Sequence, residues 1–147
     1  MANIVNYNSW DTNFKTPFGA LKTCESAIIK VESSKAFDVC SIKLIIEKDD
    51  ENLDPVLVRE LELQQSGENE EVREYSVEIS PLEQPATYYY FLSVEVNLYG
   101  EQKTLFYGKQ ANNGMICEYN YDDLNKYQLT VYEDYKVPSW FKEGVLY

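Results

Sequence analysis

Apolar and polar residues alternate along much of this chain with a period of two, the pattern of a β-strand that buries one face. The longest run begins at Tyr88 and ends at Tyr99. Its even-numbered residues would share one face: Tyr88, Tyr90, Leu92, Val94, Val96 and Leu98. Because β-branched and aromatic residues favour strand over helix, we predict a long strand here with this face in the core.

Shorter stretches of the same kind predict the other strands. They lie at residues 4–7, 27–32, 39–47, 56–64, 74–79, 104–107, 115–119 and 127–132. Many short strands separated by frequent turns are typical of an antiparallel sandwich. We therefore predict an all-β fold, an immunoglobulin-like antiparallel β-sandwich of about eight strands with a C-terminal extension.

The segments between these strands carry turn signals. Residues 8–23 form the longest predicted connection, with Pro17 and Gly19 fixing a turn inside it. Residues 65–71 are polar and contain a glycine, so they are predicted to be a loop. Residues 99–102 and 112–114 have the composition of tight turns.

The last stretch of the chain breaks the pattern. Pro138 cannot donate a hydrogen bond to a sheet, and residues 139–141 suit one helical turn. Gly144 would end that turn, and residues 145–147 would begin another apolar strand. We expect residues 1–133 to form the sandwich, and residues 134–147 to be a linker and the beginning of a further domain.

Two segments carry a family resemblance. The sequence Pro-x-Trp-Phe followed by Val-Leu-Tyr, at residues 138–147, resembles the start of the catalytic barrel in the α-amylase superfamily, glycoside hydrolase family 13, especially its neopullulanase-like members. Residues 8–12 and 17–20 resemble the opening of the N-terminal β-sandwich domain of such enzymes. Ser139 replaces a commonly acidic residue, Leu146 replaces a more usual isoleucine, and the family's following Asp-Arg-Phe run is not in this chain.

The resemblance implies a non-catalytic N-terminal domain of an intracellular hydrolase of α-glucans such as starch, maltodextrin or pullulan. Such a domain buttresses its own catalytic barrel, shapes substrate access or mediates homodimers. Trp140, Phe141 and Tyr147 would pack against the barrel. The family's catalytic acids lie on later barrel strands, so this chain is expected to hold none. The alternative is a stand-alone carbohydrate-binding or structural sandwich with no enzyme attached.

Charge and cysteine content limit the classes of partner and the locations that the sequence favours. The 147 residues carry a formal net charge of −12, which disfavours nucleic acid and anionic membrane surfaces as partners. The N-terminus has no signal-peptide pattern, and no apolar run is long enough to span a membrane. An odd number of cysteines, Cys24, Cys40 and Cys117, favours reduced thiols and a cytoplasmic location. We expect Cys40 and Cys117 to be buried in strands.

Catalytic and metal-binding patterns are scarce. The chain has no histidine, the commonest general base and metal ligand. It has no glycine-rich phosphate loop, so we predict no cofactor and no metal site. The acidic stretch at residues 49–54 offers oxygen ligands for calcium but lacks the EF-hand spacing and glycine, so a solvated hairpin loop is the favoured interpretation.

Aromatic content is the remaining signal, with thirteen tyrosines. Sugars bind by lying on aromatic faces while polar groups hold their hydroxyls. Aromatic residues on or beside the long strand, together with one tryptophan, are candidate sugar-binding residues: Trp10, Tyr89, Phe91, Tyr99 and Tyr107. Alternatively, both faces of the long strand are covered by packed neighbours, and Trp10 anchors the connection at residues 8–23.

Overall fold

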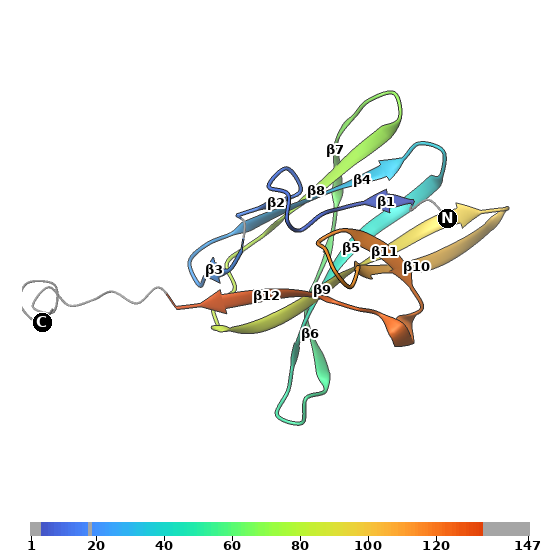
Figure 1. The fold of residues 1–147 in the computed structure, drawn as a ribbon. Coiled ribbons are helices and arrows are strands. Elements are labelled where there is room, and N and C mark those ends of the chain that lie inside the picture. The colour runs from blue at the N-terminus through green and yellow to red at the C-terminus, as the bar shows by residue number, and fades with distance from the viewer. Residues whose placement is uncertain (1–3, 18, 134–147) are drawn as a thin grey trace, which may run out of the picture.

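A computed structural model describes residues 4–17 and 19–133 and shows an all-β fold of two sheets (Figure 1). No α-helix occurs in these residues; their one helical element is the 3-10 turn η1 (Tyr121–Asp123). Accordingly, the described residues contain no helix that is long and apolar enough to cross a membrane. The predictions for residues 134–147, including Trp140, Phe141 and Tyr147, lie outside the described residues.

The first sheet has the order β1-β4-β8-β7, with all neighbours antiparallel. Its long strand is β4, which pairs with β8 along one edge and with β1 and β2 along the other. The strands of this sheet are β1 (Val5–Asn6), β2 (Lys15–Thr16), β4 (Ala27–Ser34), β7 (Gln64–Glu68) and β8 (Val72–Ile79).

The second sheet is built around β9, the longest strand. On one edge β9 pairs with β5, and β6 lies beyond β5. On the other edge β10 pairs with its C-terminal half and β12 with its N-terminal half. The strands are β3 (Leu21–Lys22), β5 (Asp38–Asp49), β6 (Pro55–Glu62), β9 (Ala86–Leu98), β10 (Glu101–Lys109), β11 (Ile116–Tyr119) and β12 (Tyr127–Tyr132).

This strand order is the immunoglobulin order. That fold places its strands A, B, E and D in one sheet and C′, C, F and G in the other. Here β1-β4-β8-β7 and β6-β5-β9-β10 reproduce both sheets in sequence order. The predicted immunoglobulin-like sandwich is therefore confirmed, and β2, β3, β11 and β12 are additions to it.

A second immunoglobulin feature is present where β9 begins. The fold often carries a tyrosine at this corner whose hydroxyl bonds to the backbone a few residues upstream. Tyr88 occupies this place, and its hydroxyl donates to the Gln84 carbonyl oxygen at 2.7 Å. This bond fixes the connection from β8 to β9.

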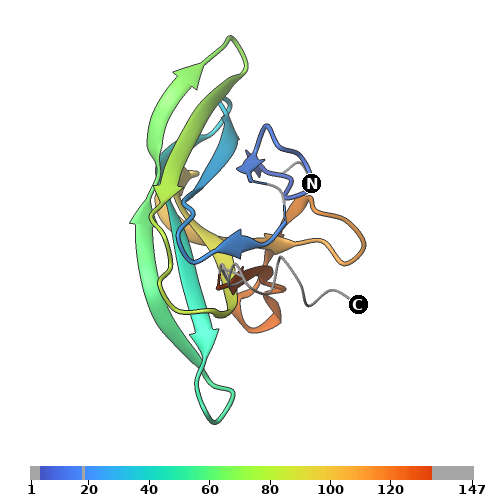
Figure 2. The same ribbon diagram turned by 90° about the vertical axis from the view of Figure 1, so that its left-hand side faces the viewer.

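The buried core confirms the predicted inward face of the long strand. Figure 2 shows the strands that surround this core. Tyr88, Tyr90, Leu92, Val94 and Val96 are all buried in it. From the first sheet they meet Val5, Ala27, Ile29, Val31 and Ile79.

At the far end of β9, Tyr99 and Gly100 both have positive φ and form the two-residue turn to β10. Positive φ at both central positions is the type I′ geometry that suits a hairpin.

Two predicted connections contain strands instead. Residues 65–71 were predicted to be a loop, but β7 occupies most of them. This strand is polar and nearly all exposed, so it gives no alternating signal. Residues 8–23 hold the two-residue strands β2 and β3, which are too short to show a period.

Between β6 and β7 the chain passes from the second sheet to the first at Leu63. This residue is buried and donates its N–H to the Ile42 carbonyl oxygen at 2.9 Å.

The prediction of buried cysteines was wrong. Cys40 is exposed, because β5 bulges between Val39 and Ser41 where it pairs with β9, which takes Cys40 out of the strand's alternation. Cys117 is partly exposed on β11. All three cysteines are free thiols.

Candidate functional site

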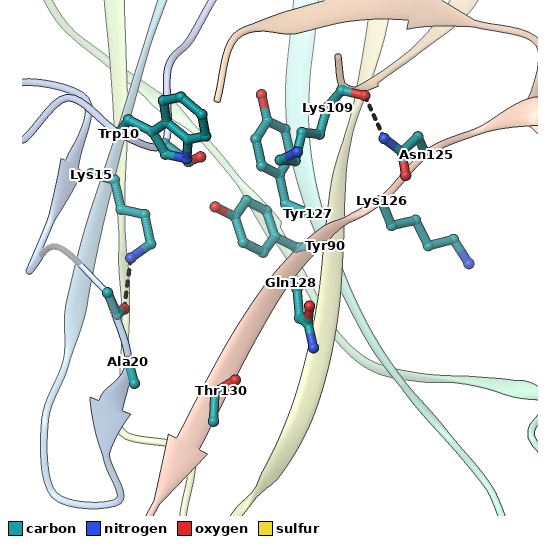
Figure 3. A pocket seen from close by; sticks show the side chains of 12 residues that line it. Trp10, Lys15, Ala20, Tyr90, Lys109, Asn125, Lys126, Tyr127, Gln128 and Thr130 are labelled. Carbon is teal, nitrogen blue, oxygen red and sulfur yellow. Dashed lines mark hydrogen bonds between the residues drawn. The ribbon is translucent and has the colours of Figure 1, made fainter. Parts of the chain in front are cut away.

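A cavity of about 450 Å³ opens between the connection from β1 to β3 and the second sheet (Figure 3). One wall comes from the early connection, and the opposite wall comes from β12 and the segment that precedes it. The lining residues are Ser9, Trp10, Lys15, Gly19, Ala20, Tyr90, Lys109, Asn125, Lys126, Tyr127, Gln128 and Thr130. Residues separated by more than a hundred positions in the sequence thus meet at one place.

Tyrosines form the inner end of this cavity. The rings of Tyr90 and Tyr127 stack with centroids 5.0 Å apart, and Tyr7 meets the Tyr127 ring edge-on. The hydroxyls of Tyr7 and Tyr90 share a hydrogen bond of 2.8 Å, and the Tyr127 hydroxyl donates to the Gly114 carbonyl oxygen. Burial raises the pKa of all three, because a tyrosinate anion would be poorly solvated there.

Removing one hydroxyl of the buried pair is expected to destabilise the fold. Tyr7→Phe should lower the free energy of unfolding by about 1–3 kcal/mol, because the Tyr90 hydroxyl loses its partner inside the core. Adding Tyr90→Phe should cost little more, since both polar groups are then absent from a site of unchanged shape. Urea unfolding of the two single variants and the double variant measures this, and fully additive losses would contradict the coupling.

Trp10 stands at the cavity with its ring in water. Its side chain is 57% exposed, but its backbone is fixed. The Trp10 N–H donates to the Asn8 side-chain oxygen, and the Ser9 N–H donates to the Gly114 carbonyl at 3.0 Å. A side chain at Gly114 would meet the Trp10 ring at 2.8 Å, so glycine is required for this close approach. A large apolar residue therefore stands on a hydrogen-bonded backbone at a polar cavity without being buried.

Lys15 anchors the early connection in the place proposed for Trp10. The residue is only 4% exposed, and its ammonium donates to the carbonyl oxygens of Pro17 and Gly19, both at 3.0 Å. Burial lowers the pKa of Lys15, because an ammonium ion loses hydration inside the protein. Trp10, the other anchor that the sequence allows, is 57% exposed.

The opposite wall is joined to β10 by backbone contacts. The Lys109 N–H donates to the Asn125 carbonyl at 2.7 Å, and the Asn125 side chain returns a bond to the Lys109 carbonyl at 2.8 Å. A side chain at Gly108 would lie 2.2 Å from the same Asn125 oxygen. Glycine at this position lets the two backbones touch and so positions Asn125, Lys126 and Gln128 beside the cavity.

A second cavity of about 320 Å³ lies on the other side of the same segment and shares Asn125 and Lys126 with the first. Tyr89, a predicted site residue, lines it together with Glu47. The Lys126 ammonium bonds to the Glu47 carboxylate at 2.6 Å and lies 5.7 Å from the centre of the Phe91 ring. Lys126 therefore directs its charge toward the second cavity and away from the first (Figure 3).

The structure does not bring the predicted sugar-binding aromatic residues together at one site. Phe91 is only 2% exposed, because Phe106 and Tyr121 pack edge-on against it. Tyr107 is fully buried, since it pairs with Leu92 and so belongs to the core face of the sheet. Tyr99 is fully exposed, but it lies ten residues along the strand from Tyr89, about 30 Å away.

Of the five predicted aromatic site residues, only Trp10 and Tyr89 line cavities, and they line different ones. Sequence reasoning missed the polar part of the site, namely Lys15, Lys109, Asn125, Gln128 and Thr130. These residues come from three separate segments, and none belongs to a recognisable motif. Only the exposed alternation of Gln128 and Thr130 along β12 was visible in the sequence.

The described residues show no arrangement for catalysis or metal binding. A glycosidase needs carboxyl groups on two sides of the scissile bond. Glu47 and Asp49 both line the second cavity, but they come from one strand, two residues apart, and Glu47 is paired with Lys126. No cluster of metal-binding side chains occurs in the part of the chain that the structure describes.

The acidic loop at residues 49–54 is organised by its own hydrogen bonds. The Asp50 carboxylate accepts the backbone N–H groups of Asn52 and Asp54 at 2.8 and 3.0 Å. The Asp50 N–H donates to the Asp54 carbonyl, which closes the loop before β6. This geometry matches the solvated hairpin loop that the sequence also allowed.

Comparison with known proteins adds no relative: no protein-family model matches this chain, and no curated protein matches it either. The resemblance to the α-amylase superfamily therefore rests on the residues themselves.

Proposed function

We propose that this chain is a non-catalytic, saccharide-binding β-sandwich domain that serves a cytoplasmic α-glucan hydrolase. The observation that carries the proposal is Trp10, a largely exposed aromatic residue on a hydrogen-bonded backbone at a polar cavity. Asn125, Gln128 and Thr130 add neutral hydrogen-bonding groups to the lining of the same cavity. An apolar face with amide and hydroxyl groups beside it is what a sugar ring requires.

The hydrolase part of the proposal is supported by the two family-like segments and by the immunoglobulin order of the strands. In such an enzyme this domain would supply binding and support, and the barrel would supply the acids. Support of the barrel, control of substrate access and dimer formation are the roles that the resemblance implies.

Binding should depend on Trp10. A shallow site buries little of its ligand, so we expect a dissociation constant for maltotriose of about 1 mM, or roughly 4 kcal/mol. Trp10→Ala should weaken binding by about tenfold or more, equivalent to about 1.4 kcal/mol, because the stacking surface is lost. Calorimetry or NMR titration measures the constants.

The matched control is Tyr99→Ala, which removes a fully exposed aromatic ring at the far hairpin tip. It should leave maltotriose affinity unchanged. Equal losses from Trp10→Ala and Tyr99→Ala, or no loss from Trp10→Ala, would contradict the proposed site.

The link to a hydrolase has its own test. The coding sequence after Tyr147 should continue in frame into a Phe-x-Asp-Arg-Phe-like run, and the chain by itself should not hydrolyse maltooligosaccharides. A stop codon at that point would favour a stand-alone binding module. Hydrolysis by the purified chain would refute the non-catalytic assignment.

A further inference from the structure

Lys15 presents an unusual charge to the cavity. The side chain lines the cavity although the residue is 96% buried, given its exposed fraction of 4%. An ammonium has three N–H donors, and two are used by the carbonyl oxygens of Pro17 and Gly19. No ion pair to Lys15 occurs in the described part of the chain. A buried positive charge thus stands here with neutral partners only.

Lys109 adds a second positive charge. Lys109 lines the same cavity, and its ammonium donates to the Gln110 carbonyl oxygen at 3.3 Å, a long contact. Figure 3 shows Lys15 below Trp10 on one side of the cavity and Lys109 beside Tyr127 on the other. Lys126 differs, because its ammonium is bonded to Glu47. Two ammonium groups are therefore available to a ligand in the cavity.

The cavity also lacks negative charge. None of its twelve lining residues is aspartate or glutamate, although the whole chain carries 25 of them against 13 lysines and arginines. The chain as a whole is thus acidic, while the lining of the cavity is basic. Burial lowers the pKa of Lys15, so a bound anion would relieve an existing electrostatic cost.

We infer that the cavity binds a saccharide that carries an anionic group, a phosphate monoester or a carboxylate. The anion lies between the Lys15 and Lys109 ammonium groups. Both ammonium groups would donate charge-assisted hydrogen bonds to it, which are stronger than hydrogen bonds between neutral groups. Trp10 covers a face of the sugar ring, and Gln128 and Thr130 meet its hydroxyls. This inference rests on the proposed saccharide-binding function and specifies its ligand class.

The test compares three disaccharide probes on the full chain at matched ionic strength. These are maltose, maltose phosphorylated on its non-reducing glucose, and maltobionate, which carries a carboxylate. Amide NMR titration gives both the affinity and the place of binding. We expect at least one anionic probe to bind about tenfold tighter than maltose and to shift the amides of Lys15, Gly19 and Lys109. The preferred probe identifies the anion.

Lys109→Gln provides the charge test, because Lys109 is partly exposed and its loss should not affect folding. This variant should reduce the preference for the anionic probe to about threefold or less, measured as the ratio of the anionic-probe and maltose affinities of the same variant. The control is Lys103→Gln, which removes the same charge from an exposed position on the same strand. It should leave the preference unchanged.

The possible results distinguish failure of the anion inference from failure of the saccharide site on which it rests. Binding of maltose with no preference for either anionic probe overturns the anion inference and leaves the saccharide site standing. Equal effects of Lys103→Gln and Lys109→Gln also overturn it, because they would reflect overall charge alone. Inorganic phosphate binding as tightly as the phosphorylated sugar overturns the saccharide site. Absence of shifts with all probes overturns both.

Discussion

Gly108→Ala is expected to lower the free energy of unfolding by about 3 kcal/mol, which would lower the melting temperature by about 10 °C. The new methyl group would lie 2.2 Å from the Asn125 carbonyl oxygen, a backbone atom that cannot rotate away. The segment must then move from β10, which breaks the 2.7 Å bond from the Lys109 N–H. Thermal unfolding followed by circular dichroism measures the loss.

Gly67→Ala is the matched control for this prediction. Gly67 also lies in a strand, but a methyl group there would meet no atom within 4 Å. Its effect should stay within about 0.5 kcal/mol of zero. Similar losses for the two variants would show that the contact between Gly108 and Asn125 is not what holds the segment.

The second large effect is expected at high pH, where the fold should be lost cooperatively between about pH 11 and 12. Four of the five tyrosines that are buried in the described residues resist ionisation most strongly: Tyr7, Tyr90, Tyr107 and Tyr127. Burial raises the pKa of Tyr107 to about 12 and raises the pKa values of the other three as well. In the unfolded chain a tyrosine ionises near pH 10.

Stability falls with rising pH because the native and unfolded states bind different numbers of protons. Above about pH 10 the unfolded chain releases protons that the native state retains, so each such tyrosine lowers stability by about 1.4 kcal/mol per pH unit. Four of them give a loss of about 5 kcal/mol per pH unit, against a typical domain stability of about 5–15 kcal/mol. Lys15, whose pKa is lowered by burial, acts in the opposite direction but is a single group.

Tyrosinate absorbance and circular dichroism, recorded on the same samples, test this account. Tyr7, Tyr90, Tyr107 and Tyr127 should ionise only above about pH 10, together with the loss of the sheet signal. The double variant with Tyr7→Phe and Tyr90→Phe should show a shallower loss with pH. Complete tyrosine ionisation with the sheet signal unchanged would contradict the assignment of these residues to the core.

The sequence predicted the parts of the fold that rest on alternation. The inward face of β9 was correct because Tyr90, Leu92 and Val94 repeat every two residues with no interruption. The prediction of β7 as a loop was wrong because Gln64–Glu68 has no apolar face, and this strand exists through its ladder with β8. The bulge at Cys40 was also invisible, since it depends on how β5 pairs with β9.

The site was less predictable than the fold. An aromatic residue on a strand can bind sugar or belong to the core, depending on which neighbours cover it. Phe91 is covered by the turn at Tyr121, which is thirty residues later in the chain. Lys15 was missed because a lysine in a polar connection is usually solvated, and its burial here depends on the carbonyls of Pro17 and Gly19.

The most direct test of the central claim is the indole N–H signal of Trp10 during a maltotriose titration, recorded on a Trp140→Phe background so that Trp10 is the chain's only tryptophan. The account predicts that this signal shifts together with the amides of Gly114 and Gln128, with a midpoint of about 1 mM. An indole signal that stays unchanged up to about 20 mM maltotriose would contradict saccharide binding at this cavity.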